Sequence, residues 1–167
     1  MKKNIICLPL VILTIACTNY PSAADYSLPP GTALPVCNLL LTDSTTYLNT
    51  AQIPEGKPFV LFLFGPQCPY SKAQIKDFTA NITELGEVPI YVVTPYSFQA
   101  MKQFYQSYHL DRYPNITTAT DYKNTLAAAF HIKAVPYIAV FDDQKKLKTA
   151  FTGKTAVRLV IKAVEQQ

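Results

Sequence analysis

An unbroken apolar run over residues 58–64 is the feature of this sequence that most constrains the fold. Its consecutive Phe, Val and Leu residues are typical of a β-strand covered on both faces, as in a sheet with helices on each side. Gly65, Pro66 and Gln67 end the run. Pro69 suits the first position of a helix, so the segment predicts a buried strand, a tight turn and a helix that starts next to Cys68.

The rest of the chain continues this alternation of strands and helices. Apolar residues at helical spacing predict further helices over residues 97–108, 122–130 and 157–164. Short apolar runs predict strands over residues 36–41, 88–93, 137–141 and 147–151, the first of them at an edge of the sheet. Two segments are predicted to lack such structure, a turn over 43–49 and an irregular stretch over 111–120. The order predicts an α/β fold, a mixed sheet flanked by helices.

The N-terminus has the pattern of a secretory signal peptide. A short basic start precedes twelve mostly apolar residues, fewer than the roughly 18 that a membrane-spanning helix needs. Small residues then lead to a cleavage position after Ala24. We therefore predict a signal peptide over residues 1–24 and one folded domain over residues 25–167.

An alternative leader ends at residue 16. Ala16-Cys17 resembles the end of a lipoprotein signal, in which the cysteine is lipidated and becomes the first residue. In both interpretations the protein is exported to the periplasm or cell envelope. Contact with a membrane is expected only through a lipid anchor on Cys17.

The charge of the chain argues against a nucleic-acid partner. The formal net charge is +4 over 167 residues, and no basic cluster is longer than Lys145-Lys146. Of the four cysteines, only Cys37 and Cys68 lie in the predicted domain. Two cysteines cannot form a Cys-only zinc site, so neither a metal nor a cofactor is expected.

Cys68 is the candidate nucleophile. It follows a buried strand and stands at the start of a helix, where free N–H groups and the positive end of the helix dipole stabilise a thiolate. Ser71 can donate a hydrogen bond to the same sulfur, and Lys72 adds a positive charge nearby. The sequence therefore indicates an accessible thiol with a lowered pKa.

Two motifs resemble the thioredoxin-like superfamily. The sequence Cys68-Pro69-Tyr70-Ser71 is similar to the glutaredoxin motif Cys-Pro-Tyr-Cys, with Ser71 in place of the second cysteine. Residues 130–137 resemble the cis-proline segment of the same superfamily. The resemblance implies that Cys68 and Ser71 form the catalytic pair, and that Pro69, Tyr70, Val135 and Pro136 line the substrate groove.

The whole domain resembles the exported thioredoxin-like proteins of bacterial envelopes. That group belongs to the broad superfamily of redoxins and alkyl-hydroperoxide-reductase/thiol-specific-antioxidant (AhpC/TSA) proteins. The resemblance implies a thioredoxin fold with an N-terminal strand or hairpin extension and an inserted helix near residues 121–130. The implied partner is a cysteine-containing protein or a low-molecular-weight thiol or disulfide.

Several residues depart from the family pattern. Ser71 cannot resolve a mixed disulfide, so only monothiol chemistry at Cys68 is expected. Phe62 and Gln74 occupy positions where relatives carry an Asp or a Glu, and Leu61 and Gly65 do not match a peroxiredoxin site. The sequence thus favours a monothiol thiol–disulfide oxidoreductase. The alternative is a redox-inactive thioredoxin-fold binding or assembly module.

Cys37 has two interpretations. It is either a small buried residue in an edge strand, or a disulfide partner of Cys68. A disulfide requires the two Cα atoms to lie within about 7 Å of each other. The sequence alone does not decide between these interpretations.

Overall fold

A computed structural model of the protein describes residues 28–166. The predicted signal peptide over residues 1–24, its alternative over 1–16 and the lipidation position Cys17 lie outside the described residues. No helix in the part of the chain that the structure describes is long and apolar enough to cross a membrane.

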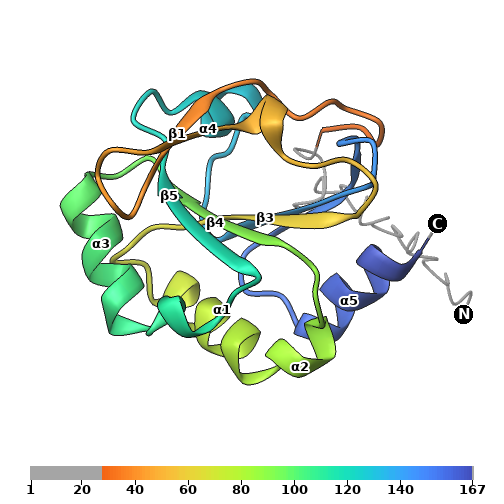
Figure 1. Cartoon of the computed structure of the whole chain (residues 1–167). Coiled ribbons are helices and arrows are strands. Elements are labelled where there is room, and N and C mark those ends of the chain that lie inside the picture. The colour runs from red at the N-terminus through yellow and green to blue at the C-terminus, as the bar shows by residue number, and fades with distance from the viewer. Residues whose placement is uncertain (1–27, 167) are drawn as a thin grey trace, which may run out of the picture.

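One seven-stranded sheet organises the domain (Figure 1). Its strands are β1 (Asn38–Leu41), β2 (Tyr47–Asn49), β3 (Phe59–Leu63), β4 (Ile90–Thr94), β5 (Ile116–Thr120), β6 (Tyr137–Phe141) and β7 (Leu147–Thr152). The α-helices are α1 (Pro69–Ala80), α2 (Ile82–Leu85), α3 (Phe98–Ser107), α4 (Thr125–Ala129) and α5 (Val157–Glu165), with short 3₁₀ turns at Thr50–Gln52 and Leu110–Arg112.

The sheet is mixed, as the sequence predicts. The strand order is β2-β1-β5-β4-β3-β6-β7, in which β3, β4 and β5 run parallel and the remaining pairs are antiparallel. The parallel strands end at one edge, which we call the carboxyl edge. Because of their direction, β6 and β1 start at this edge and β7 ends there. The predicted thioredoxin fold, an α/β sheet flanked by helices, is confirmed.

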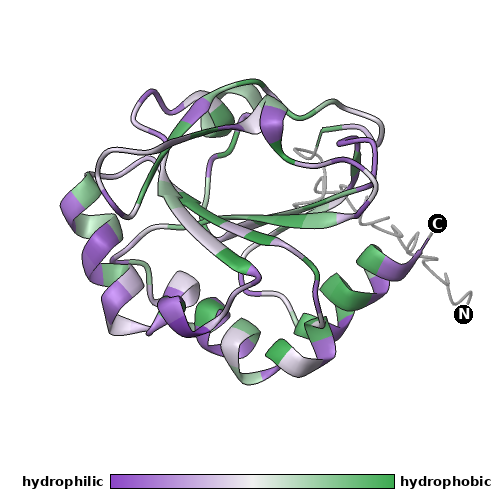
Figure 2. Ribbon diagram, in the orientation of Figure 1, coloured by the Kyte–Doolittle hydropathy of each residue, from purple (hydrophilic) through white to green (hydrophobic). Residues whose placement is uncertain are grey.

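Two apolar layers enclose the sheet. Alternate residues of β3 point to opposite sides, so Phe62 packs toward α1, α3 and α5, whereas Phe59 and Leu61 pack toward α4. Figure 1 shows α4 on one side of the sheet and the other helices on the opposite side. Figure 2 shows apolar residues along the central strands. Burial on both faces accounts for the unbroken apolar run in the sequence.

Three predictions about the N-terminal half of the sheet are wrong. Residues 116–120 form β5 rather than an irregular stretch, and residues 47–49 form β2 rather than a turn. Because β2 pairs with one side of β1 and β5 with the other, β1 is not an edge strand. The sequence Ile-Thr-Thr-Ala-Thr of β5 has no apolar run, but its β-branched residues suit a buried strand.

Phe62 ties β3 to α1 at the centre of the larger apolar layer. Its side chain is fully buried, and its ring centroid lies 5.5 Å from that of Phe78 and 5.9 Å from that of Phe64. We expect Phe62→Ala to lower the free energy of unfolding by about 3–5 kcal/mol, because it removes a large ring from a packed interior. Urea titration measures this loss. The exposed Tyr47→Ala should change stability by less than about 1 kcal/mol, and equal losses for both would contradict this view of the core.

Candidate active site

The end of β3 and the start of α1 position Cys68. The Cys68 N–H donates to the Gly65 carbonyl oxygen at 3.0 Å, which closes the turn between the two elements. The Cys68 carbonyl oxygen accepts from the Lys72 N–H at 3.0 Å, so the residue caps α1 directly before Pro69. Cys68 is partly exposed. The predicted placement of this thiol at a helix N-terminus is therefore found in the structure.

Opposing effects set the pKa of the Cys68 thiol. Burial by itself raises this pKa. Hydrogen bonding to the Ser71 N–H, the Ser71 hydroxyl and the Tyr70 N–H stabilises the thiolate and outweighs burial, which leaves the pKa below its ordinary value of 9.0. The net effect agrees with the direction predicted from sequence.

Ser71 connects the turn to the cysteine. Its side chain is fully buried, and its Oγ accepts a hydrogen bond from the Gly65 N–H at 3.3 Å. The hydroxyl proton is then available to the Cys68 sulfur. Ser71 is thus placed to stabilise a thiolate, although it has no sulfur with which to resolve a disulfide.

The segment before β6 lies against the cysteine. The Val135–Pro136 peptide bond is cis. The Cys68 Sγ lies 3.4 Å from the Val135 carbonyl oxygen, to which the neutral thiol can donate. A Cβ on Gly65 would lie 3.1 Å from Val135 Cγ2 and 3.3 Å from Cys68 Cβ, so the close approach of the two segments favours glycine there. This role of Gly65 is not predicted from the sequence. The one indication of it there is the position of Gly65, three residues before Cys68.

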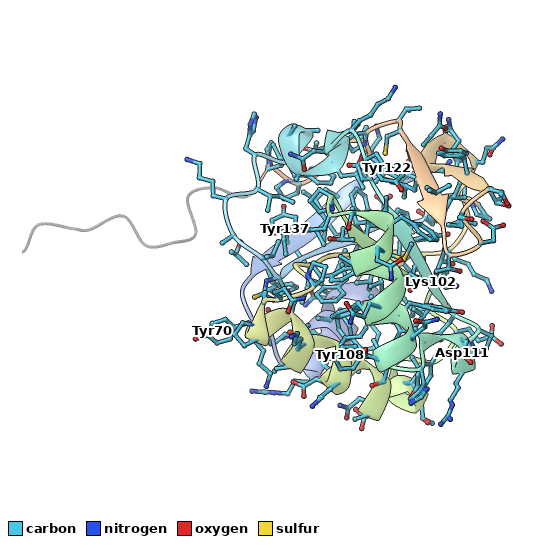
Figure 3. All side chains as sticks on the ribbon, turned by 90° about the vertical axis from the view of Figure 1, so that its left-hand side faces the viewer. Tyr70, Lys102, Tyr108, Asp111, Tyr122 and Tyr137 are labelled. Carbon is cyan, nitrogen blue, oxygen red and sulfur yellow. The ribbon has the colours of Figure 1, made fainter. Side chains whose placement is uncertain are left out.

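The surface around Cys68 combines an aromatic residue, a cation and a cavity. Tyr70 projects into solvent, as Figure 3 shows, and Pro69 beside it is exposed. Lys72 Nζ donates to Gln67 Oε1 at 3.4 Å, which holds the ammonium group over the turn. A cavity of about 260 Å³ lies beside the cis-proline segment, and its lining includes Ile132 and Tyr137.

Neutral side chains fill the two positions at which the family resemblance implies an acid. Phe62 and Gln74 are both fully buried. Gln74 Oε1 accepts a hydrogen bond from the Thr155 N–H at 2.7 Å, which links α1 to the loop before α5. Gln74 therefore has a structural contact here and supplies no ionisable group.

Cys37 lies on a different part of the carboxyl edge, directly before β1. Both Cys37 and Cys68 are free thiols in the structure. The strand order puts β1 and β3 three strand spacings apart, about 14 Å, whereas a disulfide needs Cα atoms within about 7 Å. A Cys37–Cys68 disulfide is therefore not formed in this arrangement, and the expectation that Cys37 lies in an edge strand is wrong.

The environment of Cys37 opposes ionisation. Burial raises the pKa of its thiol to about 11, the negative charge of Asp121 adds to that rise, and the Thr50 side chain partly offsets it. The Cys37 N–H also donates to Thr50 Oγ1 at 2.9 Å. Cys37 is thus a weak nucleophile at neutral pH.

A family model identifies the group to which the chain is related. The model described as the AhpC/TSA family matches residues 30–150. This chain belongs to the AhpC/TSA family. Its site places one cysteine at the start of α1, with a serine at the fourth position of the motif. A search of the curated proteins finds no match.

Solved structures share the fold of this AhpC/TSA-family chain. A thio-disulfide isomerase from Thermus thermophilus is 22% identical with a TM-score of 0.64, covering 81% of this chain and 94% of that one. A peroxiredoxin-like protein from Aquifex aeolicus is 15% identical with a TM-score of 0.67, covering 84% and 88%. An exposed lipoprotein thioredoxin from Streptococcus pneumoniae is 21% identical with a TM-score of 0.61, covering 77% and 98%. At these identities the similarity establishes the fold.

The two domain thiols should differ sharply in reactivity. At pH 7.5 roughly 1 in 3,000 Cys37 thiols is ionised for a pKa of about 11, and at least about 100 times as many Cys68 thiols are ionised. The Cys37 thiolate is intrinsically the more nucleophilic because its pKa is higher, which offsets part of this difference. Iodoacetamide should therefore modify Cys68 at least about tenfold faster, as measured by peptide mass spectrometry. As pH rises, labelling of Cys68 should level off first, because its pKa is the lower one. Equal rates at pH 7.5 would contradict the pKa directions given above.

Proposed function

We propose that this protein is an exported monothiol thiol–disulfide oxidoreductase with Cys68 as its nucleophile. The observation that supports it best is the setting of the Cys68 sulfur. This partly exposed sulfur is stabilised as a thiolate by Ser71 and Tyr70 and lies 3.4 Å from the Val135 carbonyl oxygen. In this proposal Pro69, Tyr70 and Val135 line the substrate groove, and Pro136 is buried next to Val135.

The proposed reaction has two exchange steps. The Cys68 thiolate attacks one sulfur of a substrate disulfide, a new S–S bond forms, and the other substrate sulfur leaves as a thiolate that takes a proton from water. An external thiolate then attacks the mixed disulfide and releases Cys68 as a thiolate. This second step leaves a mixed disulfide between the external thiol and one half of the substrate. A second external thiolate cleaves that mixed disulfide in solution, so that one substrate disulfide is reduced to two thiols and two external thiols are oxidised to one disulfide.

The external thiol is required because residues 28–166, which the structure describes, supply no second thiol near Cys68. Ser71 occupies the position of a resolving cysteine, and Cys37 is separated from Cys68 by about three strand spacings, some 14 Å. The external thiol is either a cysteine-containing protein or a low-molecular-weight thiol. Resolution should therefore depend on its concentration.

Export forms part of the proposal. The basic start and the short apolar segment support a signal peptide over residues 1–24. A fold shared with an exposed lipoprotein thioredoxin agrees with a location in the periplasm or cell envelope. In the alternative form of this proposal, lipidated Cys17 anchors the protein to the membrane. The mass of the N-terminal peptide of the processed protein would separate cleavage after Ala24 from lipidation.

A turnover assay tests the proposed activity. The purified protein should catalyse reduction of the neutral substrate 2-hydroxyethyl disulfide, with the rate rising with the concentration of an added monothiol. A rate no greater than the uncatalysed exchange would refute the oxidoreductase proposal. That outcome would favour a redox-inactive binding or assembly module, for which the neutral Phe62 and Gln74 at the acid positions are the supporting observation.

A further inference from the structure

The exposed charges near Cys68 are mainly positive. The segments at the carboxyl edge include residues 35–37, 50–52, 64–68, 95–97, 121–124, 131–136 and 153–156, and the one acidic residue within these ranges is the buried Asp121. The same loops carry the cations Lys123, Lys133 and Lys154, and Lys72 stands in the first turn of α1. Of the acids nearest this edge, Asp121 is buried and Asp77 pairs with Lys154 at 2.9 Å.

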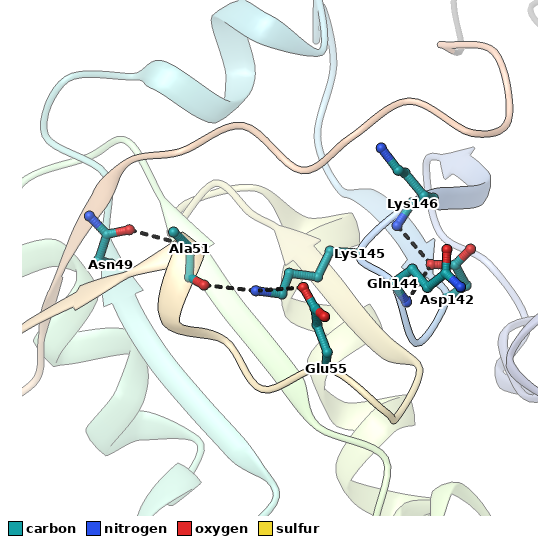
Figure 4. A network of polar contacts seen from close by, with 7 residues as sticks. All are labelled: Asn49, Ala51, Glu55, Asp142, Gln144, Lys145 and Lys146. Atoms are coloured by element: carbon teal, nitrogen blue, oxygen red, sulfur yellow. Dashed lines mark hydrogen bonds and ion pairs between the residues drawn. The ribbon is translucent and has the colours of Figure 1, made fainter.

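The opposite edge carries charges of both signs, and some of them form ion pairs. Lys57 pairs with Glu87 at 3.6 Å across neighbouring loops. Lys145 Nζ donates to the Ala51 carbonyl oxygen at 2.7 Å and pairs with Glu55 at 3.6 Å, as Figure 4 shows. The positive field of the domain is therefore concentrated on the edge that holds Cys68, where the N-terminus of α1 adds to it.

Exposed aromatic rings lie on the same edge. Among the described residues, six large apolar or aromatic side chains are exposed, and four of these belong to the carboxyl edge, namely Val36, Tyr70, Tyr96 and Tyr122. The segments carrying them follow or precede β3, β4, β5 and β1, which are neighbours in the sheet. In Figure 3, Tyr70 projects from the left side of the molecule and Tyr122 lies near the top. Such side chains provide contact area while keeping a polar group in water.

We propose that the partner of Cys68 is an acidic polypeptide segment. This inference rests on the proposed function and names the class of its substrate. The cysteine of the segment meets Cys68, its chain crosses the tyrosines, and its carboxylates face Lys72 and Lys123. Lys123 follows β5, which lies two strand spacings from β3, about 10 Å, a distance that an extended chain covers in about three residues. Acidic residues within about three positions of the partner cysteine therefore fall within reach of the cations.

Peptide binding tests the proposal without thiol chemistry. Two fluorescent peptides of equal length, each with serine in place of cysteine, differ only in carrying four Glu or four Lys. Binding to the protein with Cys68→Ser is measured by anisotropy. The acidic peptide should bind at least about tenfold more tightly at about 50 mM salt, and the preference should shrink to about twofold at about 0.5 M because salt screens exposed charges.

Two double variants of equal net charge show which lysines cause the preference for the acidic peptide. Lys72→Glu with Lys123→Glu should abolish the preference for the acidic peptide. Lys146→Glu with Lys162→Glu, at exposed positions away from the carboxyl edge, should keep most of it. Equal binding of both peptides, no measurable binding of either, or the same loss in both double variants would overturn the proposal.

The outcome can be separated from that of the proposed function. Turnover of a neutral disulfide with no preference between the peptides would refute only the acidic partner. A preference for the acidic peptide with no turnover would refute only the oxidoreductase.

Discussion

Replacing Cys68 with alanine is expected to lower the catalysed reduction of 2-hydroxyethyl disulfide by at least about 100-fold, to the uncatalysed rate. The reason is that Cys68 carries the only thiol of the described residues whose pKa is lowered. The serine, the cis-proline segment and Lys72 contain no atom that can form a disulfide. The assay is steady-state turnover with an excess of an added monothiol.

Cys37→Ala is the matched control. It removes a thiol of the same domain and should leave turnover within about twofold of the unchanged protein, because Cys37 is mostly protonated at neutral pH. Circular dichroism and the urea midpoint show whether each variant is folded. If Cys37→Ala lost activity and Cys68→Ala retained it, the assignment of the nucleophile would be wrong.

Ser71→Cys is expected to change the type of reaction. The substitution restores the Cys-Pro-Tyr-Cys pattern and places a second sulfur where the Ser71 hydroxyl already reaches the Cys68 sulfur. An intramolecular thiol attacks a mixed disulfide far faster than a dilute external one. The lifetime of the mixed disulfide should therefore fall by at least about 100-fold, and its decay should no longer depend on the external thiol.

Quenched mass spectrometry measures that lifetime, and oxidised Ser71→Cys should lose two hydrogen atoms in mass. Thr83→Cys, an exposed position on α2, adds a thiol elsewhere and serves as the control. Its mixed disulfide at Cys68 should decay as slowly as that of the unchanged protein. A long-lived mixed disulfide in Ser71→Cys would mean that position 71 cannot reach the bound partner.

The sequence predicts best those parts of the molecule that are continuous along the chain. The strand at residues 58–64, the turn and the helix from Pro69 are consecutive, and their residue types determine the local structure. The proline at 136 is recognisable from its neighbours, and the Val135–Pro136 bond is cis as the family resemblance implies. The strand at 116–120 was missed because threonines, rather than aliphatic residues, fill it.

Features that depend on topology could not be predicted in the same way. The separation of Cys37 from Cys68 follows from the insertion of β5 and β4 between β1 and β3. The positive carboxyl edge arises because loops far apart in sequence end on the same side of the sheet. A modest net charge of +4 conceals this arrangement, since the compensating acids lie mainly at the other edge.

Identification of the adduct formed with a disulfide substrate tests the central claim most directly. The protein is incubated with excess 2-hydroxyethyl disulfide at pH 7.5, quenched with acid and mapped by peptide mass spectrometry. We predict one mercaptoethanol adduct in the domain, on Cys68, that disappears when an external monothiol is added. An adduct confined to Cys37, an intramolecular Cys37–Cys68 disulfide, or no adduct at all would contradict the account.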